Sequence, residues 1–156
     1  MELLLYVGLS GTVVIMYSVL LFSAQSSREK SEAALEVNEQ LRFAVSVIER
    51  DVIGADSLDY PLLGTASSSL SLSSQDVSRN PVIFRLDGGQ IYQDEGVLSN
   101  PLTSSKVLVE SLDFRASAIG SSTVVQVAIS IRSYNPSGRQ ENEYSQSSTS
   151  TFVWRR

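Results

Sequence analysis

Acidic side chains are the groups of this chain whose type and spacing could support chemistry. Three groupings stand out, and they are Asp94-Glu95, Asp56-Asp59 and Glu141-Glu143. Neighbouring carboxylates can bind calcium or carry out acid–base work on a substrate. None of these groupings has the residue spacing of a calcium-binding loop, so we interpret them as solvated loop charges.

The sequence contains neither cysteine nor histidine. Their absence excludes thiolate nucleophiles, histidine general bases and the common zinc and copper sites. Serines are abundant, but only a Ser–Lys pair built on Lys30 or Lys106 could activate one, and nothing in the pattern supports such a pair. Asp87-Gly88-Gly89 is interpreted as a turn, because no helix follows it to present amides to a phosphate. We therefore predict no catalytic residue, no metal ligand and no cofactor, and the chain is not expected to be an enzyme.

The charge balance narrows the class of partner. The formal net charge is −5, and the twelve basic residues are scattered along the chain. Proteins that bind nucleic acid need clustered lysine and arginine to neutralise phosphates. No nucleic-acid partner is therefore predicted.

The elements that must position any functional group begin with an uncharged segment from Leu3 to Phe22. At a rise of 1.5 Å per residue, such a helix is about 30 Å long, which matches the hydrocarbon thickness of a bilayer. Its polar residues are small, a kind that membrane helices tolerate. We predict a membrane span, with a buried core helix as the alternative. Arg28 and Lys30 follow the span, and by the positive-inside tendency they would keep the C-terminal part in the cytoplasm.

The helix is expected to continue beyond the membrane, because no proline or glycine interrupts residues 23–53. Apolar residues recur there at steps of three and four, which predicts one apolar stripe along a helix. The stripe comprises Val37, Leu41, Ala44, Val45, Ile48, Val52 and Ala55. We predict one helix from Glu2 to about Ile53, and a break near Ser26-Ser27 followed by a separate helix is the alternative.

Beyond Ser57 the apolar period changes to two, which indicates strands. Asp87-Gly88-Gly89 lies between two alternating runs and predicts a hairpin, because glycine readily adopts positive φ. Further strands are expected within residues 102–114, 123–134 and 144–154, whereas the serine-rich residues 65–78 are expected to form a flexible loop or an edge. The predicted fold class is α+β, with an antiparallel meandering β-sheet covered by the apolar stripe of the long N-terminal helix.

The N-terminal segment MELLLYVGLSGTVVIM resembles the start of the hydrophobic helix of type IV pilins and type II secretion pseudopilins, entered a few residues late. In that family the prepilin peptidase removes a basic leader, and a methylated aromatic residue followed by Thr-Leu-Ile-Glu-Leu usually opens the mature chain. Glu2-Leu3-Leu4 matches the Glu-Leu-Leu of that motif. Residues 37–44 and 48–52 are similar to the region where minor pilins and J-type pseudopilins leave the shaft. The resemblance covers roughly the first third of the chain, and the rest is similar only in its short strands.

The resemblance implies a pilin-like fold and a role for Glu2. In the family this carboxylate pairs with the N-terminal amine of a neighbouring subunit inside the fibre, and such a pair would set axial register. Leu3, Leu4, Gly8 and Gly11 would pack helix to helix, first in lipid and then in the filament. The spacing alone would instead leave Glu2 at the water interface, near the positive end of the helix dipole.

Three departures from the family accompany the resemblance. The leader, the cleavage site and the first mature residues are not in the sequence, so we expect a start placed at an internal methionine, or a fragment. A basic leader before Met1 would also resolve the conflict with the positive-inside tendency. The span has no proline near its end, where Val19 or a neighbour stands, and the chain has no C-terminal disulfide pair. The latter absence favours a minor subunit over a typical major pilin.

These expectations divide the chain into three parts. Residues 1–25 form the half of the helix in the membrane or filament core, residues 26–55 its amphipathic half, and residues 56–156 an extracytoplasmic β-rich head. The expected function is that of a minor pilin or pseudopilin, held in the cytoplasmic membrane and then assembled into a filament. The expected partners are other pilin or pseudopilin subunits, the prepilin peptidase, the inner-membrane assembly platform and the lipid bilayer. The alternative is a single-pass, membrane-anchored module whose head binds a ligand or partner and never polymerises.

Overall fold

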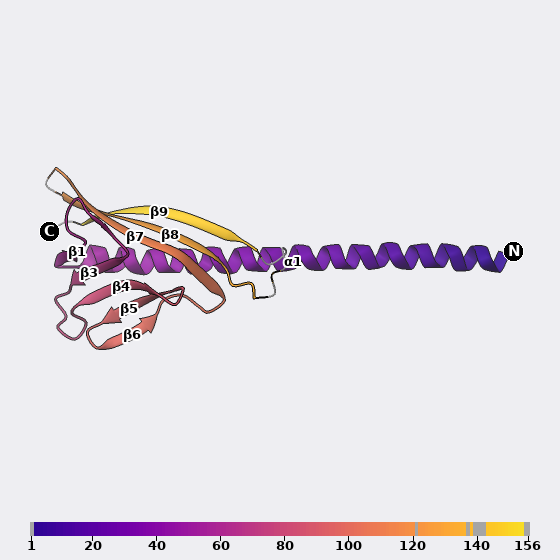
Figure 1. Ribbon diagram of the computed structural model, residues 1–156, viewed down its shortest axis with the longest axis horizontal. Helices are drawn as coiled ribbons and strands as arrows, with labels where there is room; N and C mark the ends of the chain where they lie inside the picture. The colour runs from indigo at the N-terminus through magenta and orange to yellow at the C-terminus, as the bar shows by residue number, and fades with distance from the viewer. Residues whose placement is uncertain (1, 121, 137, 139–142, 155–156) are drawn as a thin grey trace.

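One uninterrupted helix, α1 (Glu2–Gly54), runs the length of the molecule and carries a β-rich head on its C-terminal half (Figure 1). The computed structural model describes residues 2–120, 122–136, 138 and 143–154, without the side chains of Leu4 and Leu5. No break occurs near Ser26-Ser27. The absence of glycine and proline between Thr12 and Ile53 explains this continuity, since every residue there can keep helical backbone angles.

The strands of the head form two antiparallel sheets. The five-stranded sheet has the order β1-β3-β4-β5-β6, with the bounds β1 (Ser57–Tyr60), β3 (Ser69–Ser73), β4 (Val82–Asp87), β5 (Gln90–Glu95) and β6 (Leu98–Pro101). The four-stranded sheet has the order β2-β7-β8-β9, with the bounds β2 (Ala66–Ser67), β7 (Val107–Ile119), β8 (Ser122–Ser133) and β9 (Ser145–Trp154). The predicted α+β class is confirmed, and the strands are divided between two sheets where the sequence suggested one meander.

The hairpin at Asp87 is confirmed. Asp87 pairs with Gln90, so Gly88 and Gly89 form a two-residue loop between β4 and β5, with φ of 56° and 79°. Both values are positive, as a type I′ turn requires. A Cβ atom on Gly89 would lie 2.5 Å from the Cδ1 atom of Leu108, so glycine is needed there for space as well.

The serine-rich residues 65–78 differ from the expected flexible loop. Half of them form β2 and β3, and β3 is a central strand between β1 and β4. The side chains of Leu70 and Leu72 are fully buried, whereas the three serines that alternate with them are only half-buried. Two leucines at alternate positions are enough to fix this strand, because they bury its inner face in the core.

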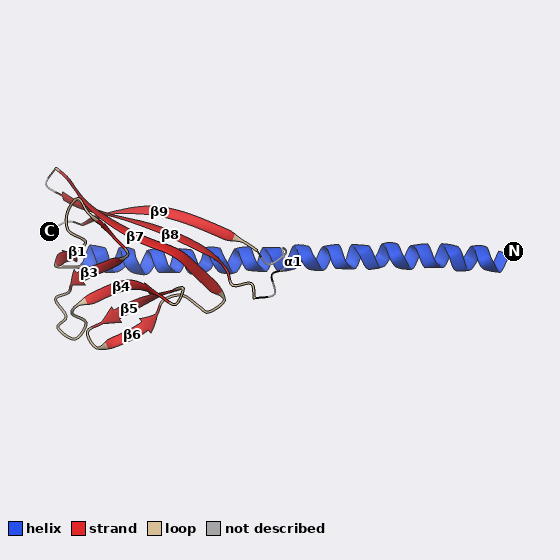
Figure 2. Ribbon diagram, viewed as in Figure 1, coloured by secondary structure: helices blue, strands red, loops and turns tan. Residues whose placement is uncertain are grey.

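The helix supplies one side of the core. Val37, Leu41, Ala44, Ile48 and Val52 of the predicted stripe are buried, and Val45 is half-buried against them. These residues contact β7, β8 and β9, which run along the C-terminal half of α1 in Figure 2. Phe84 and Ile91 of the five-stranded sheet belong to the same apolar cluster, so one core joins α1 and both sheets.

Candidate functional site

The N-terminal half of α1 projects beyond the head and exposes a continuous apolar surface (Figure 1). The side chain of Leu3 is 79% exposed and that of Val14 is 63% exposed. Among the described residues, α1 is a helix that is long enough and apolar enough to cross a membrane. The most apolar stretch of α1 is not buried against the head. Exposure of this surface to water would be unfavourable, because the free energy falls when apolar side chains leave water. The apolar half of α1 is therefore a candidate membrane span.

The hydroxyl groups in this apolar half bond to the backbone of their own helix. The Ser10 hydroxyl donates to the carbonyl oxygen of Val7 at 3.1 Å, and the Thr12 hydroxyl donates to that of Leu9 at 2.7 Å. The Ser18 hydroxyl makes the same kind of bond four residues back, at 2.8 Å. Each donor is satisfied within the helix, so these residues do not prevent α1 from lying in lipid.

The residues predicted to act in assembly all lie on this uncovered part of α1. Glu2 is in the first turn, and its side chain is exposed. Leu3 is exposed too, and the side chain of Leu4 is outside the described part of the structure. A Cβ atom built on Gly8 or Gly11 would meet no atom within 4 Å, so both glycines leave room for another helix to approach closely.

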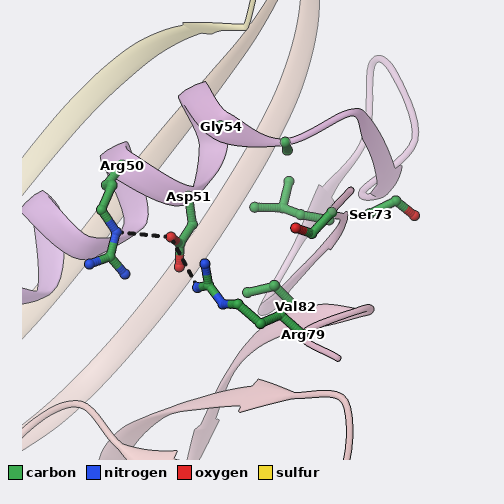
Figure 3. Close-up of a pocket in the computed structure, with 9 residues that line it drawn as sticks. Arg50, Asp51, Gly54, Ser73, Arg79 and Val82 are labelled. Atoms are coloured by element: carbon green, nitrogen blue, oxygen red, sulfur yellow. Dashed lines mark hydrogen bonds and ion pairs between the residues drawn. The ribbon is translucent and has the colours of Figure 1, made fainter. Parts of the chain in front are cut away.

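A second cluster of polar side chains joins the last turn of α1 to the five-stranded sheet (Figure 3). Asp51 is at its centre, with a side chain only 6% exposed. Its carboxylate accepts a hydrogen bond from Gln93 Nε2 at 2.6 Å and one from Arg50 Nε at 3.1 Å. It also forms an ion pair with Arg79 Nη2 at 3.5 Å. A small cavity of about 190 Å³ adjoins the cluster and is lined by Arg50, Asp51, Gly54, Ala55, Leu72, Ser73, Ser74, Arg79 and Val82.

Glu95 completes this cluster from the end of β5. Its carboxylate lies 2.5 Å from Arg79 Nη2 and accepts a hydrogen bond from Gln93 Nε2 at 2.9 Å. The hydrogen bond to Glu95 raises the pKa of Arg79 above its ordinary value, and the charge of Asp51 acts in the same direction. Arg79 and Arg50 together balance the two carboxylates, and the cluster links α1, the loop before β4, and β5. Such pairing across three segments fixes the helix to the sheet.

The described members of the acidic groupings singled out in the sequence do not gather into one site. Asp56 accepts a hydrogen bond from Gln75, and Asp59 accepts one from Ser73. Glu143 is exposed, and Glu141 lies outside the described residues. Within the described ranges, no group of three or more His, Cys, Asp or Glu side chains gathers so as to hold a metal ion.

Asp94 lies on the outer face of the same five-stranded sheet. Its carboxylate lies 2.7 Å from Arg85 Nε, and Ser99 donates a further hydrogen bond. Partial burial opposes the charged form, but the bonds from Arg85 and Ser99 outweigh it and keep the pKa of Asp94 below its ordinary value. Asp94 is therefore an ionised partner of Arg85, with a role in stability.

The two lysines considered for a Ser–Lys pair, Lys30 and Lys106, both have exposed side chains. Lys106 Nζ lies 3.6 Å from the carboxylate of Glu36, where the lysine side chain is 75% exposed. Lys30 is exposed on α1. A lysine that is to act as a base must lose its proton near neutral pH, which requires burial or a neighbouring positive charge. Neither lysine has the burial that such a role needs.

Sequence reasoning missed the cluster around Asp51. The predicted apolar stripe passes through Ile48 and Val52, and it assigns no role to Asp51 between them. The available signal was that Asp51 lies next to Val52 and three residues after Ile48, which places its charge beside the buried stripe. Its partners Arg79 and Gln93 could not be paired with it, because they are 28 and 42 residues further along the chain.

The described geometry thus offers an exposed apolar helix, a head fixed to that helix by an apolar core, and a buried ion cluster. Comparisons with protein families, with curated proteins and with solved structures found no match for this chain.

Proposed function

We propose that this chain is a structural subunit of a type IV pilus-like or type II secretion-like filament, of the minor pilin or pseudopilin kind. It is anchored in the cytoplasmic membrane as a single-pass protein with its head outside the cytoplasm, and it works by assembling through α1. Its partners are other pilin or pseudopilin subunits, with the assembly platform and the prepilin peptidase acting on it in the membrane. Its head primes or caps the filament.

The observation that carries this proposal is the apolar half of α1, which the head leaves uncovered along its whole length. A membrane anchor alone needs about 20 apolar residues and nothing more. This helix also places Gly8 and Gly11 where a Cβ atom would meet open space. Small residues at such positions let the backbones of neighbouring helices approach closely. A helix that first lies in lipid and later packs in a bundle needs both properties.

Glu2 supports the same function by its place at the start of the span. A carboxylate that enters an apolar helix bundle is costly unless it meets a positive partner. When such a partner is the N-terminal amine of the next subunit, only one axial position of the two helices is favourable. The exposed side chain of Glu2 is available for such a contact, because the head lies at the other end of α1.

The test substitutes Glu2 in cells that contain the rest of the assembly machinery. We expect Glu2→Ala to reach the membrane at the normal level. Its amount in sheared filaments should fall at least about tenfold, because a loss of about 1.4 kcal/mol in the free energy of subunit association lowers the equilibrium constant by a factor of ten. Glu2→Asp is the matched control, because it keeps the charge and should recover part of the incorporation. The measurement is the ratio of filament-bound to membrane-bound chain by immunoblotting.

Two outcomes would contradict the proposal. Incorporation of Glu2→Ala at the normal level would remove the role of Glu2 in register. A wild-type chain that stays entirely in the membrane fraction, while filaments form without it, would favour the alternative. The chain would then be a membrane-anchored module whose head binds a ligand or partner and does not polymerise.

A further inference from the structure

Each sheet of the head has two edge strands, and three of these four edges are blocked. β2 has only two residues, and backbone groups of Gly89, Gly64 and Thr65 bond to the β7 residues on either side of it. β6 has four residues and ends at Pro101. β1 is also four residues long, its register with β3 shifts between Leu58 and Tyr60, and it carries Asp59. Short strands, prolines, irregular register and charges are the means by which proteins prevent an edge from pairing with another chain.

The fourth edge, β9, has none of these protections. It runs for ten residues, and it pairs with β8 from Ser145 to Trp154 without a shift of register. Its sequence, SQSSTSTFVW, contains no charged residue and no proline. No described strand pairs with its other side. A long, regular and uncharged edge of this kind is a template for a further strand.

The alternation of the β8–β9 ladder identifies the backbone groups that are open. Ser133 N–H donates to the carbonyl oxygen of Tyr144 at 2.8 Å, so this pair exchanges backbone hydrogen bonds with the β8 side. In a regular antiparallel ladder, every second residue does the same. The N–H and C=O groups of the residues in between point away from β8, and these residues are Ser145, Ser147, Thr149, Thr151 and Val153. Their side chains lie on the outer face of the sheet, away from α1.

A groove of about 420 Å³ between β9 and α1 adjoins this edge. Leu41 and Val45 of α1 contribute its apolar part, and Ser148 and Ser150 of β9 line the opposite side. None of the groove residues belongs to β8, which places the groove at the seam between β9 and the helix. Arg42 and Glu49 also line it, so its fixed charges balance. A strand added to β9 would direct alternate side chains into this groove, and an uncharged strand would need no compensating charge.

The two ends of β9 show that it runs in the same direction as α1. Near its start, the hydroxyl of Tyr144 lies 3.4 Å from the side-chain amide of Asn38, and at its end Trp154 Nε1 donates to the carbonyl oxygen of Ala55 at 2.8 Å. Two copies joined by antiparallel β9 strands would therefore have their α1 helices antiparallel. Their apolar halves would point in opposite directions, and one membrane could not hold both.

We propose that the free edge of β9 is a docking site for an extended, uncharged strand of a different protein, which adds antiparallel to β9. Backbone hydrogen bonds to the five open residues supply the attraction, and small or aliphatic side chains at alternate positions fill the groove beside α1. The antiparallel direction follows from the more favourable ladder geometry. This site does not depend on filament assembly, because the membrane-anchored module of the alternative function would present the same edge.

The test uses the full chain in detergent micelles and a synthetic peptide, TVVQVAISI, with blocked ends, which copies the uncharged residues 123–131 of β8. This segment already pairs with the other side of β9, so it has the strand propensity and the length that the edge requires. We expect the peptide to slow amide hydrogen exchange at Ser147, Thr149 and Thr151 by at least about tenfold, as each amide gains a partner. A peptide N-methylated at alternate residues is the matched control, and it should give no protection.

Thr149→Pro tests the same edge from the side of the protein. Proline removes one open N–H group and none of those bonded to β8, so the fold should remain and the peptide should bind about tenfold more weakly. Thr149→Val keeps the N–H group and should bind normally. If Thr149→Pro fails to fold, the N-methylated peptide still decides the question.

Three results would overturn the proposal. The first is the absence of peptide binding, and the second is equal binding of the N-methylated peptide or of Thr149→Pro. The third combines two measurements made without peptide. The open amides would exchange more slowly as the protein concentration rises, and a Thr149→Cys variant would form a disulfide between two copies. The occupant of the edge would in that case be a second copy of this chain.

Discussion

Replacement of Asp51 by alanine would show how much the buried ion cluster contributes to the attachment of α1 to the head. Hydrogen bonds to charged groups contribute about 1.5–3 kcal/mol each. The pair with Arg50 adds little, because the arginine side chain is 64% exposed and solvent screens it. Arg79 and Gln93 both keep their contacts with Glu95, at 2.5 and 2.9 Å. We therefore expect Asp51→Ala to lower the free energy of unfolding by about 2 kcal/mol, and not by the roughly 3–5 kcal/mol of a buried charge left without any partner.

The assay is urea unfolding of the full chain in micelles, followed by the fluorescence of Trp154, the single tryptophan of the sequence. Its indole donates to the carbonyl oxygen of Ala55 just beyond α1, so its emission should change when the helix leaves the sheet. Glu49→Ala is the matched control, because Glu49 is exposed on the same helix and its loss should cost at most about 0.5 kcal/mol. The reasoning would be refuted if both variants had the same stability. A loss above about 4 kcal/mol would also refute it, because Glu95 would then fail to hold Arg79.

Two further predictions concern the core and the pH dependence of the head. Ile48→Ala should cost about 2–4 kcal/mol, because the fully buried isoleucine loses three carbon atoms from the core, whereas Phe43→Ala, at a half-exposed position on the same helix, should cost less than half as much by the same assay. The pKa of Asp94 is lowered in the folded chain, so its pairing stabilises the head above the unfolded value of about 4 and is lost as the pH falls through the folded value. Asp94→Asn should therefore be less stable than wild type at pH 7, and the difference should shrink as the pH falls through the folded pKa of Asp94. A constant difference across urea titrations at each pH would contradict this.

The features predicted from sequence are those set by neighbours along the chain. The continuity of α1 follows from the absence of glycine and proline, and the side on which it packs follows from the spacing of Val37, Leu41, Ala44 and Ile48. The hairpin at Gly88 and Gly89 was predictable for a similar reason, because a two-residue loop with positive φ has few solutions in sequence.

The features that escaped prediction depend on residues far apart in the chain. The alternation of a strand shows which side chains share a face, but it does not show which sheet the strand joins, so the division into two sheets was not visible. The strand at Leu70 and Leu72 was obscured by its serines, and only the core formed by other strands explains its burial. The partners of Asp51 were hidden in the same way. The proposed functional residues Glu2, Gly8 and Gly11 were singled out by resemblance and by local sequence, because in this chain they contact no part of the head.

In the proposed membrane-anchored chain, the stiffness of α1 would set how the head is carried above the bilayer. Phe22 ends the apolar segment and Val37 is the first buried residue of the helix, so about 15 residues, or roughly 20 Å, separate the candidate membrane span from the core of the head. No glycine or proline lies in this spacer to act as a hinge. The helix would therefore move as one rigid rod, and the head would move with it. A tilt of about 20° in the bilayer would swing the far end of α1, some 60 Å above the membrane midplane, sideways by about 20 Å. Neighbouring heads could then be brought together or separated by small rotations of their anchors, without any change inside the heads themselves.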